Sequence, residues 1–193
     1  MSGSQKRSGK QGQVRIIGGQ WRGRKLAFTP AEGLRPTGDR IRETLFNWLA
    51  PCIRGARCVD LFAGSGALGL EALSRGAAHC DFVDSSRATL AQVRAHLVTL
   101  EAQDRASCHA VCAQQFLQAA TAVYDIVFLD PPFRLQLVEG ICSTLAQRRL
   151  LGDAALVYIE SGADEPPPVV PPSWKLHREK ISGGVTYRLF DTN

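Results

Sequence analysis

The chain has 193 residues, of which 45% are hydrophobic and 21% are charged, an ordinary composition for a globular protein. This length allows one sizeable domain and little more. No apolar run approaches the roughly 18 residues needed to span a bilayer, and the first residues lack the apolar core of a secretory signal. We therefore exclude a membrane protein and expect a cytoplasmic location.

The net charge of +5 is concentrated near the N-terminus. Residues 1–31 hold seven basic side chains and no acid, whereas residues 32–193 hold 16 basic and 18 acidic ones. A basic arm on a near-neutral body is typical of proteins that contact phosphates, with a solubilising tail as the alternative. We expect a disordered basic tail over residues 1–12 and a single domain over 13–193, in which 13–30 form a basic hairpin extension.

The cysteines and histidines show no metal-binding pattern. The six cysteines contain no Cys-x-x-Cys pair, and the four histidines fit no zinc spacing. We expect reduced thiols and no metal site.

The first predicted structural unit is a small basic hairpin, with strands over Val14–Ile17 and Arg24–Phe28 around a glycine-rich turn that exposes Trp21. Arginines interleaved with an aromatic ring can clamp RNA through phosphate contacts and stacking. The RNA-binding candidates are Arg15, Trp21, Arg22, Arg24 and Lys25, followed by Arg35 and Arg40 from the next segment.

A loop and an amphipathic helix follow, with Thr37 or Asp39 as the predicted helix cap. Thr37 lies in the loop ahead of the helix, where a bound cofactor or a substrate phosphate could be met. Ordinary surface charge is the alternative interpretation of Arg35, Arg40 and Arg42.

The segment Cys58–Gly69 predicts a short buried strand, a glycine loop and the start of a helix. Its Gly64-x-Gly66-x-x-Gly69 pattern matches the dinucleotide fingerprint, so an NAD-dependent enzyme is one possibility. Asp60 at the strand end favours S-adenosylmethionine instead, because a carboxylate there attracts a ligand's ammonium group and repels a pyrophosphate. Asp84, at the tip of the second predicted strand, is placed to bind the two ribose hydroxyls.

Later elements complete the predicted sheet. A third strand over Ala106–Val111 leaves the sheet at Cys112-Ala113, and a further buried strand covers Ala154–Ile159. An antiparallel hairpin around Ser182-Gly183-Gly184 ends the chain. Strands that alternate with amphipathic helices predict an α/β fold with a mostly parallel seven-stranded sheet and one antiparallel edge.

The motif Asp130-Pro131-Pro132-Phe133 follows the apolar strand Tyr124–Leu129. Two prolines cannot continue a ladder, so the chain leaves at the carboxyl edge of the sheet, where α/β proteins bind ligands. Asp130 and the Pro131 carbonyl can accept hydrogen bonds from an exocyclic amino group, while Phe133 can stack on the base. A strand-end acid before a proline-stiffened loop is the alternative reading of the same residues.

Residues 59–69, Asp84 and residues 130–133 resemble the ordered motifs of class I S-adenosylmethionine-dependent amino-methyltransferases. Two N-terminal motifs narrow the resemblance: Arg15-Ile16-Ile17-Gly18-Gly19-x-x-x-Gly23-Arg24-Lys25-Leu26 and Arg35-Pro36-Thr37-x-Asp39-Arg40-x-Arg42-Glu43-x-Leu45-Phe46-Asn47. Together they resemble the bacterial small-subunit (16S) ribosomal RNA guanine-N2 methyltransferase family, from about Val14 to the final hairpin.

This resemblance implies a Rossmann-like class I methyltransferase fold, S-adenosylmethionine as cofactor, a guanine of the small ribosomal subunit as substrate, and a monomer. It implies that the catalytic residues, which receive a flipped-out base, are Asp130, Pro131, Pro132 and Phe133. The implied cofactor-binding residues are Asp60, Phe62, Ala63, Gly64, Ser65, Gly66, Asp84, Ser85, Cys112, Ala113 and Thr37. The family more often has Glu at the position of Asp84, and it has Asp or Asn, which contacts the adenine amino group, where this chain has Cys112.

Other functions remain open from the sequence. An amino-methyltransferase acting on adenine or on DNA would share every catalytic residue, and an NAD-binding oxidoreductase would share the glycine loop. A catalytically silent RNA-binding protein would keep the basic arm, but the intact Asp130–Phe133 motif disfavours it.

Overall fold

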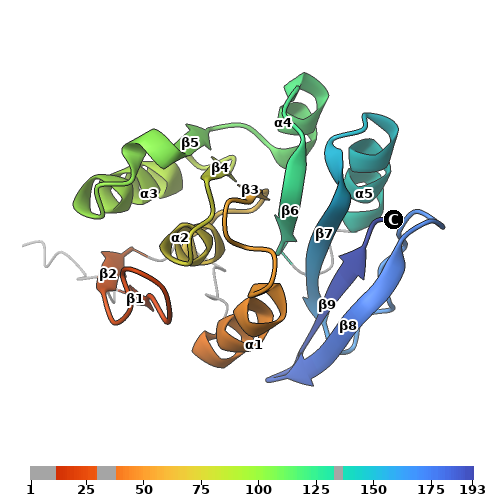
Figure 1. Cartoon of the computed structure of the whole chain (residues 1–193), viewed down its shortest axis with the longest axis horizontal. Helices are drawn as coiled ribbons and strands as arrows, with labels where there is room; N and C mark the ends of the chain where they lie inside the picture. The colour runs from red at the N-terminus through yellow and green to blue at the C-terminus, as the bar shows by residue number, and fades with distance from the viewer. Residues whose placement is uncertain (1–11, 30–37, 133–136) are drawn as a thin grey trace, which may run out of the picture.

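The computed structural model describes residues 12–29, 38–132 and 137–193, which form a three-layer α/β arrangement (Figure 1). Its central sheet has seven strands in the order β5-β4-β3-β6-β7-β9-β8. The strands are β3 (Arg57–Asp60), β4 (His79–Val83), β5 (Ala106–His109), β6 (Tyr124–Leu129), β7 (Leu151–Gly162), β8 (Lys175–Ser182) and β9 (Val185–Asp191). The first five are parallel and β9 runs antiparallel to both its neighbours. The predicted α/β fold, with its mostly parallel sheet and C-terminal antiparallel hairpin, is confirmed.

Helices cover both faces of this sheet. On one face lie α1 (Asp39–Leu49), α2 (Ala67–Ser74) and α3 (Arg87–Thr99), and on the other lie α4 (Ala113–Ala119) and α5 (Val138–Gln147), with a short 3₁₀ turn, η1 (Gln103–Arg105), before β5. Because alternate residues of a strand face opposite ways, Phe128 packs under the first group of helices and Val127 under the second. Within the ranges that the structure describes, no helix is long and apolar enough to cross a membrane.

Several element boundaries differ from those predicted. β7 is longer than Ala154–Ile159 because β9 pairs with it as far as Gly162. β5 ends at His109 and not at Val111, because the Val111 amide turns back to the His109 carbonyl. β1 begins at Gly12, the last residue of the predicted tail.

The strand order creates a switch point between β3 and β6. The chain moves outward from β3 through β4 to β5, then returns to the other side of β3 to form β6. In open α/β sheets, ligands bind at the carboxyl edge where the order reverses in this way. Asp60 is paired in register with Phe128, and the Leu61 amide donates to the Phe128 carbonyl at 3.1 Å. The ends of β3 and β6 therefore meet at the expected ligand site.

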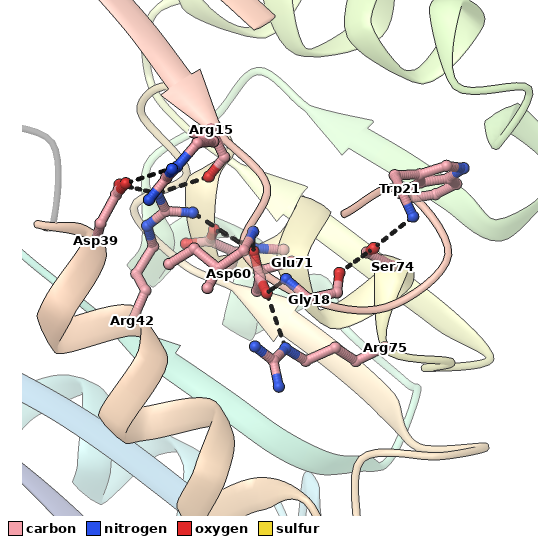
Figure 2. Close-up of polar contacts among 11 residues, drawn as sticks. Arg15, Gly18, Trp21, Asp39, Arg42, Asp60, Glu71, Ser74 and Arg75 are labelled. Atoms are coloured by element: carbon pink, nitrogen blue, oxygen red, sulfur yellow. Dashed lines mark hydrogen bonds and ion pairs between the residues drawn. The ribbon is translucent and has the colours of Figure 1, made fainter. Parts of the chain in front are cut away.

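The predicted basic hairpin is present and is docked against the carboxyl end of α2 (Figure 2). It consists of β1 (Gly12–Arg15) and β2 (Lys25–Phe28) in antiparallel register. The Gln20 amide donates to the Ser74 carbonyl at 2.8 Å, and the Ser74 hydroxyl donates to the Gly18 carbonyl at 2.6 Å. Gly19 has φ +76°, and a Cβ there would lie 1.9 Å from the Ser74 carbonyl oxygen, so only glycine permits this approach.

A buried carboxylate fixes the hairpin more deeply. Glu71 of α2 is fully buried, and its two oxygens accept the Ile17 and Gly18 amides at 2.8 Å each. The same carboxylate contacts the Arg75 guanidinium at 2.8 Å and that of Arg42 at 3.5 Å. The hairpin, α1 and α2 are thus joined through one charge (Figure 2).

The interpretation of Arg42 as surface charge is wrong, because its side chain is only 2% exposed. Besides Glu71, its guanidinium donates to the Arg15 carbonyl at 2.8 Å and to Asp39 at 2.6 Å. Asp39 binds Arg42 and Arg15 and does not cap α1, whose N-cap is Gly38 without a side-chain hydrogen bond. A folded hairpin is needed to complete the partners of this buried arginine.

We predict that Glu71→Gln lowers the free energy of unfolding by about 3 kcal/mol, because removing one partner of a buried ion pair leaves the other charge uncompensated. Urea denaturation followed by circular dichroism measures the change. Glu43→Gln is the matched control, since it removes the same charge from an exposed position on α1 and should change stability by less than about 0.5 kcal/mol. Equal losses in the two variants would contradict the proposed role of Glu71.

Candidate active site

The parallel strands bring three predicted site acids to one edge of the sheet. Asp60 ends β3, while Asp84 and Asp130 directly follow β4 and β6. Asp60 is paired in register with Phe82 of β4 and with Phe128 of β6. Asp84 lies two residues beyond Phe82, and Asp130 lies two residues beyond Phe128. Because a step of two residues returns to the same face of a strand, the three acids lie on the face that α2 covers. The charges of Asp130 and Asp84 both raise the pKa of Asp60, so the three carboxylates interact.

The glycine loop between β3 and α2 is fixed by backbone contacts. The Ala63 amide donates to the Val83 carbonyl at 2.9 Å, which attaches the loop to the end of β4. Gly66 is the N-cap of α2 and has φ +78°, a conformation that favours glycine. Gly69 serves packing, since a Cβ there would lie 2.3 Å from the Phe82 ring. The last glycine of the fingerprint therefore lets α2 approach the sheet.

Asp60 combines a structural contact with a buried oxygen that lacks one. Its Oδ2 accepts the Gly69 amide at 3.2 Å, which holds the first turn of α2. Its Oδ1 is buried and has no hydrogen-bond partner among the residues that the structure describes. Burial raises the pKa of Asp60 to about 7; the Gly69 and Phe62 amides oppose this rise, and the Asp130 and Asp84 charges add to it. An ammonium group would satisfy this oxygen, so the site fits S-adenosylmethionine and would repel a pyrophosphate.

Asp84 holds the other side of the glycine loop. Its Oδ2 accepts the Gly64 amide at 3.0 Å and its Oδ1 accepts the Ser86 amide at 2.8 Å. Each carboxylate oxygen can accept a second hydrogen bond, which leaves capacity for two ribose hydroxyls. The ribose role stays a prediction, and the structure adds a role in shaping the loop.

The catalytic candidates lie directly across the switch point. Asp130 is half-buried, Pro131 is buried and Pro132 is exposed. The last residue pair between β6 and β7 is Leu129 with Ile159, so Asp130 and Pro131 begin directly after the end of β6. Phe133, the predicted stacking residue, lies outside the described residues.

The remaining cofactor candidates surround this edge. Phe62 and Ser65 are half-buried, Ser85 is exposed, and Ala113 begins α4 with a buried side chain. Cys112 is the N-cap of α4 but makes no side-chain capping bond. An Asp or Asn there could accept a helix amide, which a thiol does poorly. Thr37 and Arg35 lie outside the part of the chain that the structure describes.

The RNA-binding candidates do not all point to solvent. Arg22, Arg24, Lys25 and Arg40 are exposed, and Arg15 is exposed while paired with Asp39 at 3.1 Å. Trp21 is half-buried against the core, and the Arg105 guanidinium lies 5.2 Å from its ring centre. The prediction of an exposed Trp21 is therefore wrong, because the ring packs as part of the hairpin's docking surface.

Two acids of the structure were missed by sequence reasoning. Glu71 stands alone as a charge in the otherwise apolar sequence of α2, a signal of a buried partner. Glu160 of β7 is 3% exposed and accepts the Tyr158 hydroxyl at 2.7 Å. It follows a buried strand residue as Asp60, Asp84 and Asp130 do, and that repeated pattern could have identified it.

Comparison with known proteins agrees with this geometry. Residues 14–191 match the family model described as conserved hypothetical protein 95. Ribosomal RNA small subunit methyltransferase D of Escherichia coli K12 is 52% identical over 179 residues, which cover 93% of this chain and 90% of that protein. The Haemophilus influenzae protein of the same name is 45% identical over 183 residues, covering 93% and 94%. A solved Escherichia coli structure described as a candidate methyltransferase, yhhF, has a TM-score of 0.86 and 50% identity over 93% of this chain and 98% of that one. The predicted Rossmann-like class I methyltransferase fold is confirmed.

We predict opposite effects of Asp60→Asn on cofactor affinity and on stability. The folded pKa of Asp60, about 7, lies above its unfolded value of 3.8, so ionising this buried group costs stability as pH rises between these values. The stability of the variant relative to the natural protein should therefore increase from pH 5 to pH 8. Its affinity for S-adenosylmethionine should fall by about tenfold or more at pH 8, because a charge-assisted hydrogen bond is lost.

Thermal melts of the free protein and calorimetric titration with S-adenosylmethionine, both from pH 5 to pH 8, measure the two effects. The affinity of the natural protein for S-adenosylmethionine should increase as Asp60 ionises near pH 7, and the affinity of the variant should not show this increase. Parallel stability curves, or the same affinity step in both proteins, would contradict this role of Asp60.

Proposed function

This chain belongs to the conserved hypothetical protein 95 family, together with the ribosomal RNA small subunit methyltransferases D, and we propose that it transfers a methyl group from S-adenosylmethionine to the exocyclic N2 of a guanine in small-subunit ribosomal RNA. The observation that supports this most is the pair of acids across the switch point. Asp60 on β3 offers a buried acceptor to the cofactor, and Asp130 after β6 places a half-buried carboxylate beside the base. A transferase needs its two substrates side by side in this way.

On the cofactor side, we assign the methionine part to Asp60 and the backbone of residues 62–66, and the ribose to Asp84 with Ser85. The backbone at Cys112-Ala113 lies beyond the end of β5, where the adenine ring would lie in this arrangement. Cys112 offers no strong acceptor to the adenine amino group, so the Ala113 amide is the contact that we expect there. The bound cofactor supplies an electrophilic methyl group on a sulfonium sulfur.

On the base side, the chain's task is to orient a poor nucleophile. The N2 lone pair of guanine is delocalised into the ring. Hydrogen bonds from N2 to the Asp130 carboxylate and the Pro131 carbonyl would direct that lone pair at the methyl carbon and stabilise the positive charge that grows on nitrogen. The electron pair of the broken S–C bond would stay on the sulfur as a thioether, and Asp130 or a water would accept the proton that N2 gives up.

The choice of base and of nucleic acid is the finer part of the proposal. An adenine or DNA amino-methyltransferase would use the same Asp130 and Pro131, so the alternative differs only in substrate. The names of the relatives favour small-subunit ribosomal RNA. The exposed basic residues Arg22, Lys25 and Arg40 provide contacts for its phosphates, and we expect the enzyme to act as a monomer.

We predict that labelled S-adenosylmethionine, offered with unmethylated small subunits, naked ribosomal RNA and duplex DNA, yields N2-methylguanosine at one site of the subunit RNA. Asp130→Asn should lower this transfer by about 100-fold or more, because a transition-state hydrogen bond to a charged acceptor is removed. Its affinity for the cofactor should stay within about threefold of the natural value.

Asp125→Asn is the matched control. Asp125 lies at the other end of β6, is exposed and accepts the Arg57 amide at 2.8 Å, a contact that asparagine can keep. The control should transfer methyl groups normally. Label on adenine or in DNA would refute the guanine assignment, and near-normal transfer by Asp130→Asn would refute the role of Asp130.

We predict that Arg22→Ala with Lys25→Ala weakens RNA binding and lowers the slope of its logarithmic salt dependence by about 0.7–0.9 per lost phosphate contact. Cofactor affinity should not change. Deleting residues 1–30 is a poorer test, because it removes two hydrogen-bond donors from Glu71 and should weaken both kinds of binding through misfolding. Lys175→Ala, an exposed change on β8 at the far edge of the sheet, is the control (Figure 1). An unchanged salt slope in the double variant would show that RNA binds elsewhere.

A further inference from the structure

A fourth carboxylate continues the row of acids at the carboxyl edge. Leu129 of β6 is paired in register with Ile159 of β7, so Asp130 and Glu160 are the next residues on two adjacent strands. Neighbouring strands lie about 4.8 Å apart. Glu160 is also two residues beyond Tyr158, which packs with Phe128 under α1. Glu160 therefore stands beside Asp130 on the same face of the sheet.

Tyr158 holds this carboxylate in a fixed orientation. Its hydroxyl donates to Glu160 Oε1 at 2.7 Å, and its fully buried ring lies between Phe128 and Tyr187, with centroid distances of 6.4 and 6.5 Å. Burial raises the pKa of Tyr158, and the nearby charges of Glu160 and Asp130 raise it further. The hydroxyl thus keeps its proton and remains a donor to Glu160 at every physiological pH.

A buried acid is costly unless a donor satisfies it. Along this edge, the Oδ1 atom of Asp60 lacks a partner in the described part of the chain, which is an independent sign that a ligand with hydrogen-bond donors completes the site. Tyr158 donates to Oε1 of Glu160, and a carboxylate can accept several hydrogen bonds at its two oxygens. A base that enters beside Asp130 would bring its own donors to the same row of acids.

Building on the proposed guanine-N2 activity, we propose that Glu160, oriented by Tyr158, selects guanine over adenine by accepting the hydrogen bond of guanine N1–H. Guanine presents two adjacent donors on this edge, N1–H and the N2 amino group, which suit two adjacent carboxylates. Adenine presents an amino group next to an unprotonated N1, whose lone pair would face the Glu160 carboxylate. Asp130 accepts from either amino group, so it cannot distinguish the two bases, and Glu160 can.

The test replaces the target guanine, once mapped, by 2-aminopurine in subunits assembled from ligated RNA. This base keeps the 2-amino group but has no hydrogen on N1. The natural enzyme should transfer methyl groups to guanine about 100-fold more efficiently than to 2-aminopurine, measured as kcat/KM with labelled S-adenosylmethionine. This comparison needs no variant and so does not depend on the folding of one.

Glu160→Gln should remove most of that preference. Its kcat/KM for guanine should fall by about 10–100-fold, while that for 2-aminopurine should hold or rise, because the glutamine amide can donate to an unprotonated N1. Tyr158→Phe, which frees the carboxylate without removing it, should reduce the preference partially. Glu179→Gln is the control. Glu179 lies on the outer strand β8, where it pairs with Arg188 of β9, and this variant should leave both rates unchanged.

A purely structural role of Glu160 predicts a different result, in which Glu160→Gln slows both substrates by the same factor. That outcome, or equal use of guanine and 2-aminopurine by the natural enzyme, would overturn the role of Glu160 while leaving N2 methylation intact. Label on an atom other than N2 would overturn both proposals.

Discussion

The helix α2 is held at each end by a buried carboxylate, and the position of both functional regions depends on these two contacts. At its amino end Asp60 accepts the Gly69 amide, which fixes the glycine loop against the end of β3. In its last turns Glu71 accepts two hairpin amides and contacts two arginines. The basic hairpin is therefore attached, through one short helix, to the loop that we assign to the cofactor. Any displacement of α2 would shift both regions together.

The carboxyl edge of the sheet concentrates negative charge at a cost to stability. Asp60 and Glu160 lie on β3 and β7, while Asp84 and Asp130 directly follow β4 and β6, and these four strands are adjacent. Burial and the charges of Asp130 and Asp84 raise the pKa of Asp60. Such clusters are typical of sites where ligands bring hydrogen-bond donors. The ammonium group of a cofactor and the amino edge of a base are donors of this kind.

The two charged regions also complement the two parts of a nucleotide. In the function that we propose, the exposed hairpin and α1 residues Arg22, Lys25 and Arg40 attract phosphates, whereas the acidic edge repels them and attracts donors on a base. An RNA strand bound in this way would therefore present a base edge, and not a phosphate, to the acids. This arrangement favours a base turned out of its stack, as chemistry on an exocyclic amino group requires.

The sequence by itself determined the order of strands and helices, the glycine loop and the acids at the ends of three strands, because alternation, turn residues and strand-end carboxylates are local features. Only the tertiary structure decided what lies beside them. Trp21 and Arg42 read as surface residues, yet contacts with residues far along the chain bury them wholly or in part, and a local pattern does not contain those contacts. Likewise, the place of Glu160 beside Asp130 follows from the parallel register of β6 with β7, which long-range pairing sets.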